Sequence, residues 1–146
     1  GGLYAEKGCR YAEDATLWLK ILLNESVYFH LPPLVGFHRD ASALSGNFRG
    51  VRPVEPFLEE PGLVARICPP ELQPLLRGFY AYRACKTASV LGYWGESRQA
   101  RALVRRFVSW SDWRSPFFAT ALVACTPAGG LLGKLWRSLA SARKTR

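Results

Sequence analysis

The stretch ELQPLLRGFYAYRACKTASVLGYWGESRQARALVRRFVSW, residues 71–110, decides the fold, because its apolar residues follow the period of an α-helix. The first run at this spacing comprises Leu72, Leu75, Leu76, Phe79 and Tyr80 and continues to Leu91. Gly92 and Gly95 are expected to end that helix. The residues that follow predict a second, amphipathic helix with its arginines mostly outside the apolar face. Together the two segments predict an αα-hairpin.

Two more helices are expected towards the C-terminus, over residues 117–125 and from about Gly130 onward. The apolar set of the last one is Leu131, Leu132, Leu135, Trp136 and Leu139. Its basic set is Lys134, Arg137, Arg143, Lys144 and Arg146. A basic amphipathic helix of this kind lies on an anionic membrane surface or packs on its own domain with a solvated basic face, and the sequence leaves both readings open.

The N-terminal part gives a mixed signal. Residues 14–23 have a wide apolar surface at helical spacing, which predicts a helix buried on most sides. Residues 26–31 and 34–39 are β-prone, and Pro32 and Pro33 separate them, so we expect two short strands or one bent strand. The predicted fold class is therefore α+β but mainly helical, with a short two-strand element and a buried helix followed by a C-terminal helical bundle.

The charge is divided unevenly along the 146 residues. Residues 1–71 carry 7 Lys and Arg against 9 Asp and Glu, whereas residues 72–146 carry 13 against 2. Because residues 72–146 are so basic, we expect them to attract anionic lipid, nucleic acid or a phosphorylated ligand. The chain has no Met and opens on GGLY, from which we read it as a piece of a longer protein.

The cysteines and the proline content add two expectations. Cys9, Cys68, Cys85 and Cys125 form no C-x-x-C pair, so we expect small buried side chains in a reducing compartment. Residues 51–70 are rich in Pro and Gly and are predicted to link an N-terminal part, residues 1–50, to a basic helical region, residues 71–146.

Two adjacent acids, Glu13 and Asp14, stand at the start of the first predicted helix. Acids at this place complement the helix dipole, and Asp is a good N-cap. The alternative is a catalytic carboxylate with its neighbour, since a carboxylate within hydrogen-bond reach of a hydroxyl acts as general base.

The order of motifs around this pair resembles a known family. An opening GG comes about a dozen residues before ED, the helix ATLWLKI follows, and then come two β-prone stretches split by Pro and the segment FHRDASALS. This order is similar to the C-terminal part of the catalytic domain of family 2 glycosyltransferases, which have the GT-A fold. The resemblance covers residues 1–46 and assigns residues 1–50 to such a domain, without its N-terminal donor-binding part.

The resemblance implies a role for each matching position. Asp14 would be the catalytic base and Glu13 its supporting neighbour. Gly1, Gly2 and Leu3 would form the acceptor loop, and His38 would be a metal ligand. Arg39 would face the diphosphate of the donor, and Ser42 and Ser45 would match the Ser-rich turn.

Two features depart from the family pattern. The usual order of an aromatic residue, Arg, any residue and His is replaced by Phe37, His38, Arg39 and Asp40, and no D-x-D occurs in the chain. We therefore expect this chain alone to bind donor weakly or not at all and to hold no metal.

For the parent protein the resemblance implies an inverting transfer from a nucleotide-sugar donor to a saccharide or lipid-linked acceptor, assisted by Mg²⁺ or Mn²⁺. The expected location is cytoplasmic, on the inner face of the membrane. The alternative is a basic helical module without catalysis that binds a membrane surface or nucleic acid.

Overall fold

The computed structural model describes residues 12–28 and 50–144, and in these two ranges the regular structure is entirely helical. The elements before the long helix are α1 (Glu13–Asn24), α2 (Pro56–Glu59), α3 (Gly62–Ala65) and the 3₁₀ helix η2 (Pro70–Leu72). They are followed by α4 (Gln73–Trp94), α5 (Ser97–Phe107), the 3₁₀ helix η3 (Trp110–Arg114), α6 (Phe118–Ala124) and α7 (Pro127–Lys144).

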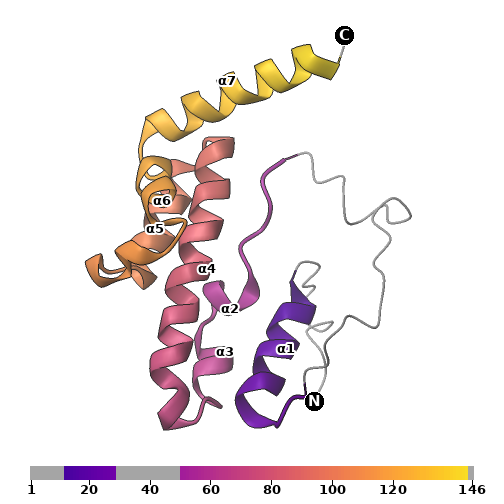
Figure 1. Ribbon diagram of the computed structural model, residues 1–146, viewed down its shortest axis with the longest axis vertical. Helices are drawn as coiled ribbons and strands as arrows, with labels where there is room; N and C mark the ends of the chain where they lie inside the picture. Colours follow the sequence, from indigo (N-terminus) through magenta and orange to yellow (C-terminus); the bar gives the residue numbers. More distant parts are fainter. Residues whose placement is uncertain (1–11, 29–49, 145–146) are drawn as a thin grey trace.

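The longest of these helices, α4, runs through the body, and α5, α6 and α7 pack against it (Figure 1). At its end Gly95 adopts a left-handed conformation with φ 94°, and the amides of Gly95 and Glu96 donate to the carbonyls of Gly92 and Leu91. This Gly-terminated end turns the chain directly into α5, because only glycine takes a positive φ without strain. The predicted αα-hairpin is confirmed, with Gly95 as its stop, whereas Gly92 lies inside the helix.

The predicted α+β fold class is wrong: this is a helical protein, and the described residues contain no strand. The first β-prone segment begins with Ser26, Val27 and Tyr28, which have no regular structure and are exposed. A strand needs a neighbour for its amides and carbonyls, and β propensity alone does not supply one. The rest of the predicted two-strand element lies outside the described residues.

Helix α1 contacts α2 and α3 (Figure 1). Thr16 and Leu19 are buried, whereas Trp18 and Leu22 are 58% and 48% exposed. The helix is therefore buried along one side, not on most sides as its wide apolar surface predicted.

Residues 51–70, which were predicted to be a linker, hold some of the most buried side chains. Phe57, Leu58 and Val64 are fully buried, and the Phe57 ring lies 5.6 Å from that of Phe79 and 6.3 Å from that of Tyr80. The Tyr80 hydroxyl donates to the carbonyl of Pro61 at 3.1 Å. These contacts fix α2 and α3 to the first half of α4, while the predicted domain boundaries stay a prediction.

Candidate functional site

The start of α1 carries the predicted acidic pair on an unusual backbone turn. Ala12, which precedes the helix, has φ 55° and is the one non-Gly residue of the described ranges with a positive φ. This left-handed conformation costs an Ala about 1–2 kcal/mol. The amide and the hydroxyl of the fully buried Thr16 both donate to the Ala12 carbonyl, at 3.2 and 3.1 Å. The buried Thr16 thereby stabilises the backbone conformation of Ala12, directly before the acidic pair.

Asp14 is exposed in the first turn of α1, and its Oδ1 accepts a hydrogen bond of 2.7 Å from the amide of Ala15. This bond orients the carboxylate but is not an N-cap bond, because the N-cap of α1 is Ala12 and the cap position has no side-chain hydrogen bond. Glu13 is the first residue of the same helix. The other predicted site residues, Gly1, Gly2, His38, Arg39 and Ser42, lie outside the described residues.

The described ranges contain no cluster of three or more His, Cys, Asp or Glu side chains that could hold a metal ion. His38, the ligand that the resemblance implies for Mg²⁺ or Mn²⁺, lies outside these ranges.

A partly buried ion pair joins the segment before α2 to the middle of α4. Glu55 is 3% exposed, and its Oε1 accepts a bond of 2.5 Å from the guanidinium of Arg83. The hydroxyl of Thr87 lies 3.0 and 2.8 Å from the two carboxylate oxygens. A cavity of about 180 Å³ lies beside this pair, with Arg52 and Lys86 on its wall. Since both oxygens of Glu55 have partners, this cluster serves first to anchor the segment on α4.

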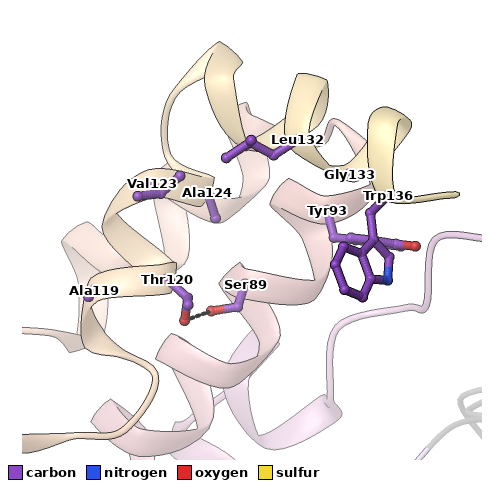
Figure 2. Close-up of a pocket in the computed structure, with 10 residues that line it drawn as sticks. Ser89, Tyr93, Ala119, Thr120, Val123, Ala124, Leu132, Gly133 and Trp136 are labelled. Carbon is purple, nitrogen blue, oxygen red and sulfur yellow. Dashed lines mark hydrogen bonds between the residues drawn. The ribbon is translucent and has the colours of Figure 1, made fainter. Parts of the chain in front are cut away.

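A larger, mostly apolar groove of about 560 Å³ lies between α4, α6 and α7. Figure 2 shows Trp136 of α7 beside Tyr93 of α4, and the hydrogen bond between the hydroxyls of Ser89 and Thr120, 2.9 Å long, on the opposite wall. The remaining lining residues are Ala119, Val123, Ala124, Gly129, Leu132 and Gly133.

Glycines set how α7 meets the body at this groove. A Cβ on Gly133 would overlap the carbonyl oxygen of Tyr93, and one on Gly92 would overlap Ala124. Arg137 reinforces the contact, because its guanidinium donates to the Tyr93 carbonyl at 2.5 Å and lies 4.5 Å from the centroid of the Trp94 ring. Helix α7 thus docks through backbone contacts and one arginine.

The large apolar side chains of α7 are consequently left mostly exposed, although Leu132 and Trp136 also line the groove. Their exposed fractions are 61% for Leu131, 57% for Leu132, 62% for Leu135, 67% for Trp136 and 64% for Leu139. The spacing of these residues in the sequence predicts one apolar face but not the direction in which it turns. The sequence signal for that direction is the set of glycines at positions 129, 130 and 133, because a residue without a Cβ lets one backbone approach another closely.

No single helix in residues 12–28 and 50–144 is long and apolar enough to cross a bilayer. Residues Phe118–Ala124 and Pro127–Leu139 together meet the requirement of length and composition, but the pair is bent by 100°.

The pKa of two cysteine thiols, Cys85 and Cys125, is raised. Burial raises the pKa of Cys85, and the Asp112 carboxylate and Cys125 add to this effect, whereas a hydrogen bond with the Ser115 side chain opposes it. Burial also raises the pKa of Cys125, against the charges of Arg101 and Arg105. Cys68 and Cys85 are buried, as predicted, and Cys125 is half-buried.

No profile of a protein family matches the chain, and neither a curated protein nor a solved structure matches it at a significant level. The resemblance to family 2 glycosyltransferases therefore stays a prediction.

Proposed function

We propose that this chain is the C-terminal part of an inverting glycosyltransferase in which Asp14 is the general base. The order of motifs in residues 1–46 supports the reaction class. The observation that carries the role of Asp14 is its place: an exposed carboxylate in the first turn of a helix, two residues after the left-handed Ala12. Strained backbone concentrates at functional sites, because the surrounding structure must hold it there.

The local geometry fits the task of a base. The Ala15 amide donates to Oδ1 and orients the carboxylate. Oδ1 has a second lone pair and Oδ2 is a further acceptor, so the group can take the proton of an acceptor hydroxyl as that hydroxyl attacks the anomeric carbon. A single attack on the face opposite the leaving nucleoside diphosphate inverts the anomeric configuration. The Mg²⁺ or Mn²⁺ that the resemblance implies belongs to the parent protein, where it would neutralise the diphosphate leaving group.

Helix α1 gives this carboxylate a firm support. Leu19 belongs to the core that also contains Phe57, Leu58 and Val64, and Thr16 is fully buried. A catalytic group needs such a rigid support, since small displacements lower the rate strongly.

The test is Asp14→Asn in the parent protein, with radiolabelled UDP- and GDP-sugars as donors and a cell extract as the source of acceptor. We expect transfer to fall about a hundredfold or more, because Asn cannot accept the proton, while donor binding is retained. Glu25→Gln is the matched control, since Glu25 is an exposed acid at the other end of α1. Equal transfer by the Asn variant and the wild type would refute the assignment of the base.

A further inference from the structure

The feature that the proposed function leaves unexplained is the outward apolar face of α7, which we define as Leu131, Leu132, Leu135, Trp136 and Leu139. In a protein whose helices pack only on each other, the apolar stripe of a surface helix faces the core. Here the inward face consists of glycines and Arg137, and every residue of the outward face is more than half exposed. Isolated exposed apolar residues are ordinary, but a contiguous set of this size marks an interaction surface.

We propose that this outward face docks on the surface of an anionic lipid bilayer, with α7 lying in the plane of the interface. Helices that do so combine Leu and Trp on one face with Lys and Arg on the other. Lys134 is exposed on α7 at a position off the outward face, and Lys144 ends the same helix. The charge of residues 72–146, with 13 basic against 2 acidic residues, complements an anionic surface.

The connection between α6 and α7 fits a helix that lies on the membrane. The 100° bend between the two helices and the glycine contacts with α4 hold α7 across the end of the body, from which it extends outward (Figure 1). Because α7 is held in this position, its outward face can meet a membrane surface without any other helix unfolding.

The apolar groove extends the same surface inward. Leu132 and Trp136 belong both to the outward face and to the wall of the groove. Figure 2 shows Trp136 at the edge of the groove, beside Tyr93. A Trp at this place matches the preference of indole for the boundary between acyl chains and headgroups. The groove therefore leaves space beside α7 for the acyl chains of lipids at the interface.

The experiment measures binding of the 146-residue chain to vesicles by co-sedimentation. One set of vesicles contains phosphatidylglycerol and phosphatidylcholine, and the other contains phosphatidylcholine alone. We expect binding to the anionic vesicles, weakened more than about tenfold without the anionic lipid, because each basic residue near the surface contributes to the attraction. The double variant Leu131→Gln/Leu135→Gln should bind the anionic vesicles more than about tenfold more weakly. Trp113→Ala, which removes a 63% exposed Trp from η3, should bind like the wild type.

A second measurement reports insertion directly. Lipids with brominated acyl chains should quench the fluorescence of the wild type, and Trp136→Phe should lose most of that quenching while it keeps its binding. Absence of binding, equal binding to both kinds of vesicle, or unchanged binding by the double variant would each overturn the proposal. A dimer in solution that the double variant dissociates would also overturn it, because a second copy would then cover the face. None of these measurements depends on sugar transfer, so the two proposals fail separately.

Discussion

The two ends of α4 are packed in opposite ways. Near its start, large side chains fill the interface: Phe57 and Leu58 are fully buried against the helix, and the ring of Phe107 lies 5.6 Å from that of Tyr80. Near its end, Gly92 and Ala124 bring α4 and α6 into backbone contact, and Gly133 does the same for α7. The interface near the start of α4 buries large apolar side chains, whereas the interface near its end leaves the large apolar side chains of α7 exposed.

Helices α5 and α7 show what this difference does to two amphipathic sequences. In α5, Ala100 and Leu103 are buried and the four arginines 98, 101, 105 and 106 are exposed. In α7 the leucines are exposed, and Gly129 and Gly133 are buried. An apolar face therefore does not by itself say what it will pack against, because a stripe of small residues competes for the position next to the neighbouring backbone.

The largest expected difference is in the free energy of unfolding, when Leu is replaced by Ala at one buried and one exposed position. Leu58→Ala should lower the free energy of unfolding by about 3–5 kcal/mol, because it leaves a cavity in a fully packed site. Leu139→Ala, at a position that is 64% exposed, should change it by less than about 0.5 kcal/mol. Urea denaturation followed by circular dichroism measures both values. A large loss for Leu139→Ala would mean that the outward face of α7 is covered within the protein.

A smaller effect tests the glycine contacts. Gly133→Ala should destabilise the protein by about 1–3 kcal/mol, because the new Cβ overlaps the carbonyl oxygen of Tyr93. Gly78→Ala is the matched control: no atom lies within 4 Å of the added methyl, so the better helix propensity of Ala should stabilise α4 by about 0.5–1 kcal/mol. Hydrogen exchange in α7 should speed up only in the first variant. Equal exchange in both would show that α7 does not dock through Gly133.

Much of the helical layout could be predicted from the sequence, because apolar period and helix-ending glycine are local signals. The helices expected at 14–23 and 117–125 correspond to α1 and α6 within one or two residues. Gly92 was misjudged as a stop because glycine serves close packing as well as helix ends, and only the position of Ala124 distinguishes the two uses. The expected strand failed for a similar reason, since pairing is a property of the neighbours and not of residues 26–28.

The candidate site was less accessible to prediction. The acidic pair suggested a helix start, and the structure places Asp14 in the first turn of α1. The left-handed Ala12 and its hydrogen bonds with Thr16 carry no sequence signal, because Ala is not a residue that favours a positive φ. The direction of the outward face likewise depends on contacts between residues about 40 positions apart, such as Tyr93 and Gly133.

The smallest effect concerns Cys85, which lies in α4 between the two kinds of packing. Because burial raises the pKa of this thiol in the folded protein, the unfolded chain loses its proton first, above a pH of about 8.5. From there up to the folded pKa the unfolded state binds fewer protons, so stability falls as pH rises, by at most about 1.4 kcal/mol per pH unit for one thiol. Cys85→Ala should flatten this fall, and Cys125→Ala should do so as well, because burial also raises the pKa of Cys125. Urea denaturation between pH 8 and 9.5 measures the slope. If the double variant keeps the slope of the wild type, water reaches both thiols in the folded protein, and burial does not raise their pKa.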